Sequence, residues 1–239
     1  MLLERLREEV LEANLELVRR GLVLYTFGNA SGISRDQGLV VIKPSGVPYE
    51  KLKPGDMVVT DLAGAIIEGA LLPSSDLPTH LVLYRNFATI GGVAHTHSEF
   101  ATAWAQSGRS LPCLGTTHAD YFHGPVPVTE FLTAEEIAGG YEENTGTAIC
   151  RAFEQLDPEE IPGVLVRGHG PFAWGPDATV AARNAVILEA VARLSYYTTA
   201  LSPDAEPLPA VLHDKHFRRK HGATAYYGQV AEKKVEKKT

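Results

Sequence analysis

The sequence predicts a single α/β domain in which helices pack on a largely antiparallel sheet. Three observations favour this class. The 239 residues suffice for one sizeable core, and 44% are hydrophobic against 21% charged, which is typical of a globular protein. Short β-rich runs follow one another closely near the start, separated by polar turns, as in antiparallel hairpins. Helical patterns precede these runs and later alternate with further strands.

Composition also limits function and location. The chain carries 22 Lys and Arg against 29 Asp and Glu, a formal net charge of −7. Nucleic acids and membrane surfaces are polyanionic, so we expect neither as a partner. Cys113 and Cys150 form no Cys-x-x-Cys pair, and we find neither an apolar leader nor a long apolar stretch. These features favour a cytoplasmic protein without a membrane span.

The first third of the chain predicts one helix and then a run of strands. Apolar residues recur every three or four positions from Leu3 to Leu17, which indicates an amphipathic helix, and Gly21 is expected to end it. The segments GNASG, RDQG, KPSG and DLAG are expected to be the breaks between strands. The predicted strands are residues 22–27, 39–42, 57–60 and 65–67.

The middle of the chain alternates helices with a buried strand. Ser75 or Asp76 is expected to cap a helix that ends near residue 87, with Pro78 in its first turn. Thr133 and Glu136 form a capping-box pattern. The helix that they begin is expected to break at the Gly-Gly pair 139–140 and to resume after residue 144. Between these helices, residues 92–97 predict a strand and residues 99–106 a helix.

The last third predicts two strands and two helices. Residues 163–167 and 171–174 are apolar runs on either side of a Gly-His-Gly turn. Asp177 is expected to cap a long helix over residues 178–201. A final helix is expected over residues 209–220.

Three of the nine histidines have a pattern suited to a metal. His95 and His97 end a strand, and residues i and i+2 of a strand point to the same face. His169 lies in the Gly-His-Gly turn, and Asp76 offers a carboxylate. Imidazole and carboxylate groups are ligands of Zn²⁺. A lone His-x-His pair is more often two ordinary histidines, so both interpretations stay open.

Three glycine- and serine-rich loops are candidate phosphate-binding segments. They are residues 28–32 (GNASG), 43–46 (KPSG) and 73–76 (PSSD). Backbone N–H groups and hydroxyls can hold a phosphate, and Lys43 adds a cation to the second loop. Each loop taken alone is more often an ordinary turn.

Two further polar segments carry groups that can transfer protons or bind anions. In residues 115–121, His118 or Asp120 is a candidate acid or base, although the segment also suits a hydrogen-bonded turn. Residues 214–227 are basic and aromatic, which suits either an anionic ligand or an exposed helix end. Neither a dinucleotide fingerprint nor a complete P-loop is present, so we expect no nicotinamide and no nucleoside triphosphate.

Seven segments together resemble the class II aldolase/adducin-head family. In order they are GNASG, VVIKPSGVPY, GALLPSSDLPTH, GGVAHTHSEFATAWAQ, GTTHADYF, PGVLVRGHGPFAWG and DKHFRRKHGATAYYGQ. The resemblance covers residues 1–229 and leaves residues 230–239 as a charged tail. It implies a single-domain, three-layer α/β/α fold with a mostly antiparallel central sheet. It also implies a homotetramer with active sites at subunit interfaces.

The resemblance assigns roles to individual residues. It implies that His95, His97 and His169 hold Zn²⁺, for which Mn²⁺ or Co²⁺ can substitute, beside the acidic residue Asp76. Aldolases of the family usually have Glu at that place, whereas its epimerases have Asp. Two residues match the acid/base pair of the epimerases, which a neighbouring subunit supplies: Asp120 and Tyr227. The implied substrate and phosphate contacts are Gly28, Asn29, Ser45, Gly46, Ser74, Ser75, His216 and Arg219.

The implied activity is the conversion of L-ribulose 5-phosphate to D-xylulose 5-phosphate, in pentose catabolism of the L-arabinose type. Because C4 is not adjacent to the carbonyl, its inversion is expected to proceed by cleavage and re-formation of the C3–C4 bond. Two alternatives remain, namely an aldolase acting on another sugar phosphate and a non-catalytic, adducin-head-like oligomerisation module. Asp76 and the Asp120/Tyr227 pair argue against the first, and the three histidines argue against the second.

Overall fold

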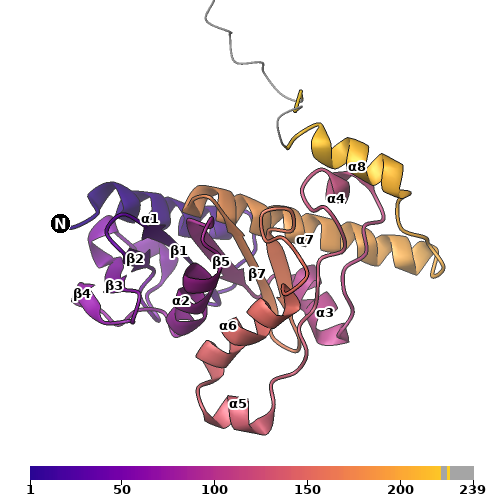
Figure 1. Cartoon of the computed structure of the whole chain (residues 1–239). Coiled ribbons are helices and arrows are strands. Elements are labelled where there is room, and N and C mark those ends of the chain that lie inside the picture. The colour runs from indigo at the N-terminus through magenta and orange to yellow at the C-terminus, as the bar shows by residue number, and fades with distance from the viewer. Residues whose placement is uncertain (222–224, 227–239) are drawn as a thin grey trace, which may run out of the picture.

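The computed structural model describes residues 1–221 and 225–226 (Figure 1). Within them the strands form one seven-stranded sheet in the order β4-β3-β2-β1-β5-β7-β6, and every neighbouring pair is antiparallel. The predicted α/β class with a mostly antiparallel sheet is confirmed. The strands are β1 (Gly28–Ser34), β2 (Leu39–Ile42), β3 (Val58–Asp61), β4 (Ile66–Glu68), β5 (Gly92–Thr96), β6 (Gly163–Val166) and β7 (Gly170–Gly175).

The helices of the described residues surround this sheet. Two long helices, α1 (Glu4–Arg19) and α7 (Ala178–Leu201), run along one side of it, whereas α2 (Leu77–Asn86) and α6 (Tyr141–Ala152) lie on the other (Figure 1). The sheet is therefore the middle layer of an α/β/α arrangement. The remaining helices are α3 (Glu99–Ser107), α4 (Thr116–Ala119), α5 (Ala134–Ala138), α8 (Ala210–Arg218) and the 3₁₀ turns η1 (Tyr49–Lys51) and η2 (Pro54–Asp56).

Small residues bring the first helical layer close to the sheet. Ala30, Ala94 and Ala173 face α1 and α7 in one core cluster. A Cβ added at Gly92 would lie 2.4 Å from the backbone nitrogen of Ala178, so only glycine permits the start of α7 to pack there. This close packing fixes the central strand β5, which carries His95 and leads directly into His97.

The second helical layer covers the face from which the candidate site is built. Val93, Phe172 and Trp174 of β5 and β7 are buried against α2 and α6. The two helices themselves are in close contact, because a Cβ at Gly146 of α6 would lie 2.6 Å from Cβ of Val82. Thr79 of α2 also donates to the backbone oxygen of Glu142 at 2.6 Å, so the first turns of the two helices are joined.

Helix α3 is anchored directly after β5. The carboxylate of Glu189, on α7, accepts hydrogen bonds at 2.9 Å from the backbone nitrogens of Phe100 and Ala101. A carboxylate at a helix N-terminus satisfies unpaired N–H groups and complements the helix dipole. This contact fixes the chain immediately beyond His97.

Two predicted elements in the first half of the chain are wrong. Residues 22–27 form a loop instead of a strand, with Tyr25 at a φ of 52°. GNASG, expected as a break, begins β1 and pairs with both β2 and β5. Its small side chains suit this crowded position, since a Cβ at Gly32 would lie 2.9 Å from Leu6. Tertiary pairing thus overrides a local sequence typical of a turn.

Most other predicted elements lie where they were expected. Asp177 caps α7 by accepting from the nitrogen of Val180, and Thr133 forms the predicted capping box. Helix α6 differs, because it begins at Tyr141 and not after residue 144. Gly140, with a φ of 130°, supplies the break between α5 and α6.

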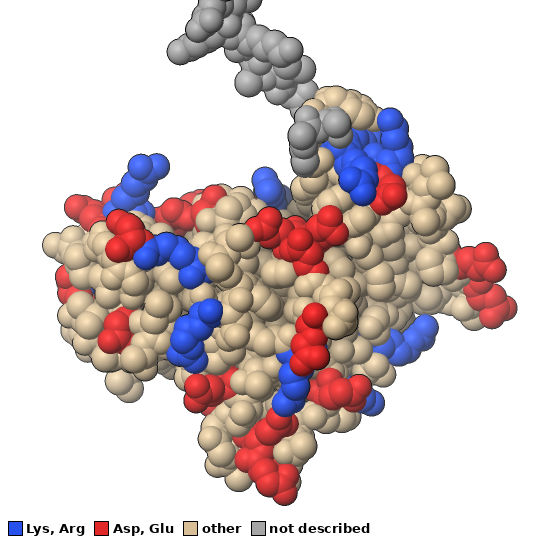
Figure 2. Space-filling view, in the orientation of Figure 1, with Lys and Arg blue, Asp and Glu red and all other residues tan. Residues whose placement is uncertain are grey.

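The C-terminal helix α8 packs beside α4 at one end of the molecule (Figure 1). Figure 2 shows Lys and Arg side chains gathered on α8, whereas basic and acidic side chains are interspersed over the rest of the visible face. Part of the basic, aromatic run predicted over residues 214–227 is thus helical. None of the helices described is both long and apolar enough to cross a membrane.

Candidate metal and substrate site

The three predicted metal histidines lie together. His95 is the fourth residue of β5, His97 follows the end of that strand, and His169 lies in the turn between β6 and β7. One ligand nitrogen from each ring lies within 4.8 Å of the other two. The three ring centroids are 4.7 to 5.0 Å apart. The strand period therefore places His95 and His97 on the same face, as predicted.

The backbone conformation of the turn between β6 and β7 places His169 beside the end of β5. Gly168 has a φ of 74°, a conformation that favours glycine. A Cβ at Gly170 would lie 2.8 Å from the backbone oxygen of Thr96. Both glycines that flank His169 are thus needed for the turn to approach the end of β5.

The rings are held in the neutral form that binds a metal. His95 is buried, and its Nδ1 donates to the backbone oxygen of Pro171 at 2.9 Å, which leaves Nε2 free for a ligand bond. Burial lowers the pKa of His95 to about 3, although Asp76 acts in the opposite direction. Burial also lowers the pKa values of His97 and His169. Three neutral imidazoles on one open cavity suit Zn²⁺, which catalytic sites bind through three protein ligands.

Asp76 lies beside the histidines but outside their compact set. It precedes the first residue of α2, and its Oδ2 accepts from Nδ2 of Asn29 at 2.6 Å. Burial raises the pKa of Asp76, but His95, His80 and the Asn29 hydrogen bond outweigh it, so the net shift is downward. Asp76 is therefore a carboxylate next to the candidate metal ligands.

One atom of the buried side-chain amide of Asn29 has no hydrogen-bond partner among the described residues. Its Oδ1 accepts no hydrogen bond from the described residues, although it is fully buried. Buried polar atoms in native proteins usually have a partner. Since Asn29 lines the same cavity as the histidines, this oxygen is available to a bound ligand.

The three glycine- and serine-rich loops, which the sequence alone could not place relative to one another, line one cavity. The backbones of residues 43–46 and 72–74 pair, with the nitrogen of Ser45 donating to Leu72 and that of Ser74 donating to Lys43. Gly46 has a φ of 65°. Gly28 lies against β5, where a Cβ would be 2.9 Å from the oxygen of His95. Three loops that are far apart in the sequence thus form one wall of a single pocket.

One cavity of about 380 Å³ unites these groups. All four predicted metal residues and six of the predicted substrate residues line it. The predicted members are Gly28, Asn29, Ser45, Gly46, Ser74, Ser75, Asp76, His95, His97 and His169.

The cavity also contains residues outside the predicted set of site residues. Phe27 lies beside His97, with ring centroids 6.2 Å apart. Tyr141 and Glu142 reach the cavity from the start of α6. Lys43, noted only as the cation of its loop, is buried with its Nζ 4.7 Å from the centre of the Tyr49 ring. Lys43 and Phe27 each had a sequence signal, as the cation of a candidate loop and as the residue before GNASG, whereas Tyr141 and Glu142 had none.

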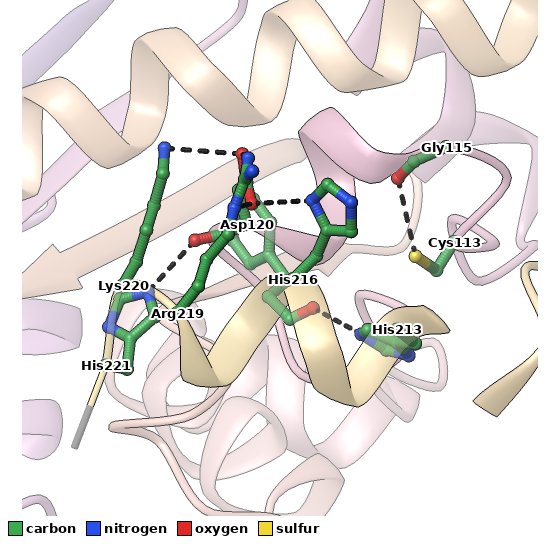
Figure 3. A network of polar contacts seen from close by, with 9 residues as sticks. Cys113, Gly115, Asp120, His213, His216, Arg219, Lys220 and His221 are labelled. Carbon is green, nitrogen blue, oxygen red and sulfur yellow. Dashed lines mark hydrogen bonds and ion pairs between the residues drawn. The ribbon is translucent and has the colours of Figure 1, made fainter. Parts of the chain in front are cut away.

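Asp120 lies in a second polar cluster, which Figure 3 shows from close by. Arg219 donates to both carboxylate oxygens, at 2.9 and 2.6 Å, and Nδ1 of His216 lies 3.0 Å from Oδ1. Nζ of Lys220 is 3.4 Å from Oδ2, and Nε2 of His221 is 2.9 Å from the backbone oxygen of Asp120. The structure thus brings three predicted residues, Asp120, His216 and Arg219, together.

This second cluster is separate from the histidine cavity within one chain. Asp120, His216 and Arg219 are absent from the residues that line that cavity. Desolvation opposes ionisation of Asp120, but hydrogen bonds from Arg219 and His216 lower its pKa overall. Its predicted partner Tyr227 lies outside the described residues. The predicted acid/base pair therefore has one described member, an ionised carboxylate.

Residues 8–196 match the family described as the Class II Aldolase and Adducin N-terminal domain. The chain belongs to this family. The resemblance predicted from the seven sequence segments is thereby confirmed, together with the fold class.

Curated relatives within the family match over almost the full chain. The L-ribulose-5-phosphate 4-epimerase UlaF of Salmonella paratyphi A is 52% identical over 227 residues, which is 95% of this chain and 100% of the relative. The protein of the same name from Salmonella typhi has the same identity and coverage. This chain thus has close relatives that are named as epimerases.

Solved structures of the family share the fold. An L-fuculose 1-phosphate aldolase superposes with a TM-score of 0.79 at 25% identity, covering 90% of this chain and 95% of that one. The L-fuculose-1-phosphate aldolase of Thermus thermophilus gives a TM-score of 0.66 at 26% identity, covering 83% and 97%. The same layered sheet therefore also occurs in members named as aldolases.

Proposed function

We propose that this protein interconverts L-ribulose 5-phosphate and D-xylulose 5-phosphate by breaking and re-forming the C3–C4 bond. The observation that carries the proposal is the single cavity in which three neutral histidines face loops suited to a phosphate. The 52% identical relatives named L-ribulose-5-phosphate 4-epimerase support this substrate.

His95, His97 and His169 would hold the metal, with Asp76 as the acidic residue beside it. When bound, Zn²⁺ supplies Lewis-acid stabilisation of negative charge on the oxygens of the three-carbon part of the substrate. Mn²⁺ or Co²⁺ would substitute for it. The protein's part is to keep the imidazoles neutral through burial, which lowers their pKa values.

The phosphate would lie against the paired loops. Ser45, Ser74 and Ser75 offer hydroxyl groups, and the backbone of Gly46 approaches without a side chain. Lys43 adds a positive charge, although burial lowers its pKa to about 8. At pH 7 the ammonium form still dominates, and a bound phosphate dianion favours it further. This wall would hold the two-carbon fragment after the bond is cleaved.

Asp120 and Tyr227 would transfer the protons at the C4 hydroxyl from opposite sides. The ion pair with Arg219 keeps Asp120 ionised, so it suits the role of base. A tyrosine has an ordinary pKa of about 10 and suits the role of acid. While the phosphate is held, rotation of the aldehyde presents its other face, and bond formation then gives the inverted C4.

The separation of the two clusters within one chain supports a shared active site. Asp120 does not line the histidine cavity of its own chain, so we place it and Tyr227 at the cavity of a neighbouring subunit in a homotetramer. The metal identity, this assembly, the cytoplasmic location and the L-arabinose type of pathway stay predictions.

The test is incubation of purified protein with L-ribulose 5-phosphate, followed by detection of D-xylulose 5-phosphate. Chelator-treated protein is the matched control. Stoichiometric bound NAD, or a large primary isotope effect from deuterium at C4, would instead indicate oxidation at C4 and contradict bond cleavage. Net release of glycolaldehyde phosphate as the main product would identify an aldolase. Absence of bound metal in active protein would contradict both assignments.

A further inference from the structure

The ring of His169 has a hydrogen-bond partner that the proposed reaction does not use. The hydroxyl oxygen of Tyr141 lies 3.2 Å from Nδ1 of His169, and the two ring centroids are 6.0 Å apart. Tyr141 is the first residue of α6 and is 38% exposed at the cavity. The contact therefore joins the N-terminal end of a helix to the turn that carries one candidate metal ligand.

Several contacts hold Tyr141 in this place. Thr145 donates its hydroxyl to the backbone oxygen of Tyr141 at 2.8 Å. Thr79 of α2 donates to the backbone oxygen of the next residue, Glu142, at 2.6 Å. Gly146 lets α6 pack directly on Val82 of α2. The first turn of α6 is thus attached to the helix that begins beside Asp76.

The chemistry of imidazole determines what this hydrogen bond does. A neutral imidazole has one N–H and one free lone pair. If Nε2 of His169 binds a metal, the proton must be on Nδ1, which then donates to the tyrosine oxygen. His95 has the same arrangement, with Nδ1 directed at the backbone oxygen of Pro171. Outer hydrogen bonds of this kind fix the tautomer and orientation of metal-binding histidines.

We propose that Tyr141 is a positioning residue that orients His169 and selects its Nδ1–H tautomer for metal binding. The inference rests on the proposed metal site. Tyr141 acts through His169 and is not a catalytic residue. The Pro171 carbonyl that positions His95 belongs to the backbone of β7, whereas the Tyr141 hydroxyl is carried by a side chain of a separate helix. The packing of α6 on α2 therefore directly affects metal affinity.

The experiment compares Tyr141→Phe with wild type and with Tyr197→Phe, which removes a hydroxyl from an exposed tyrosine on α7. Zn²⁺ affinity is measured by competition with a chromogenic chelator, and the visible spectrum is recorded with Co²⁺ in place of Zn²⁺. Loss of an outer hydrogen bond to a metal ligand typically costs 10- to 100-fold in affinity. We expect about a tenfold loss, together with an altered Co²⁺ spectrum, in Tyr141→Phe alone.

Each other outcome is informative. An unchanged affinity and spectrum in Tyr141→Phe would overturn the inference while leaving the metal site intact. An unchanged affinity with a lower kcat would assign the hydroxyl to the substrate and also overturn it. Wild-type protein that binds neither ion would overturn both this inference and the proposed function. The urea midpoints of the metal-free proteins should agree, and a lower midpoint in Tyr141→Phe that accounts for the weaker binding would contradict a positioning role.

Discussion

Asn29 on β1 lies directly opposite His95 on β5 in the antiparallel register. The side chain of Asn29 also donates to Asp76 at the start of α2. One buried amide thus links the two strands and the helix that surround the candidate metal site. Its remaining oxygen faces no donor among the described residues, which makes Asn29 the residue through which fold and ligand binding are most directly connected.

Replacing Asn29 with Ala should affect both stability and product release. The substitution leaves the Asp76 carboxylate without its amide donor, and a hydrogen bond to a charged group contributes about 1.5–3 kcal/mol. We expect urea denaturation to show a loss in free energy of unfolding within that range. We also expect slow escape of glycolaldehyde phosphate from the loosened site, detected during turnover of L-ribulose 5-phosphate.

The matched control is Asn86→Ala. Among the described residues, Asn86 donates to the backbone oxygen of Val82 within its own helix, so its loss should leave both quantities near the wild-type values. Equal fragment release from the two variants would show that Asn29 does not retain the substrate.

Removing the metal should abolish turnover without unfolding the protein. The three histidines are not among the members of the two apolar core clusters, so we expect the metal-free chain to keep its fold. Bound metal still stabilises the native state by mass action, by about 2.7 kcal/mol at a concentration 100 times Kd. Thermal unfolding with and without chelator, and recovery of activity with Zn²⁺, Mn²⁺ or Co²⁺, would measure both effects. Full activity in metal-free protein would refute the metal site.

Subunit mixing tests whether the histidine cavity and Tyr227 act together from different chains. His97→Asn and Tyr227→Phe proteins should each be nearly inactive, but mixed assemblies would contain some interfaces with both groups intact. We expect partial recovery of activity after exchange, up to about a quarter of wild type at equal mixing if the exchange is random. Mixtures of His97→Asn with His169→Asn provide the control, since no cavity in them is complete. No recovery in verified mixed assemblies would place both groups in one subunit.

The attachment of α8 should depend on pH through His123. Its Nδ1 lies 2.9 Å from Glu160 and its Nε2 2.6 Å from Asp214 of α8. Burial lowers the pKa of His123, but the hydrogen bonds to Glu160 and Asp214 raise it by more. The net shift of this pKa is therefore upward. A raised folded-state pKa adds stability that is fully present below the unfolded value of about 6.5 and is lost as the pH rises through the folded value.

We therefore expect the stability difference between wild type and His123→Gln to shrink as the pH rises from 5.5 to 9. The free energy of unfolding at several pH values measures it. His213, whose ring lies 5.3 Å from that of His123, also faces this group, so His213→Gln is the control for a general histidine effect. A difference that stays constant with pH would mean that His123 contributes only by packing on Phe217.

Local sequence patterns were sufficient to predict most elements and the shared face of His95 and His97. The apolar repeat of α1, the Asp177 cap of α7 and the Thr133 capping box each depend on neighbouring residues alone. The His-x-His pair depends on the two-residue period of a strand, which the structure confirms. Such features are visible in the sequence because their physical cause lies within a few residues.

Features that depend on distant neighbours could not be predicted in this way. GNASG has the composition of a turn, yet it lies between β2 and β5 because its small residues alone tolerate the packing of Leu6 and the backbone of His95. Tyr141 reached the site because Gly146 lets α6 pack on α2. Neither fact leaves a periodic signal in the sequence.

The sequence by itself determined the family, the residue types of the site and the order of the helices and strands. Only the tertiary structure decided which groups share a cavity. It placed Asn29, Ser45 and His169 on one cavity and Asp120 with Arg219 in another cluster. The physical reason is that side-chain periodicity acts over a few residues, whereas the pairing of strands and the packing of helices bring together groups up to about 140 residues apart.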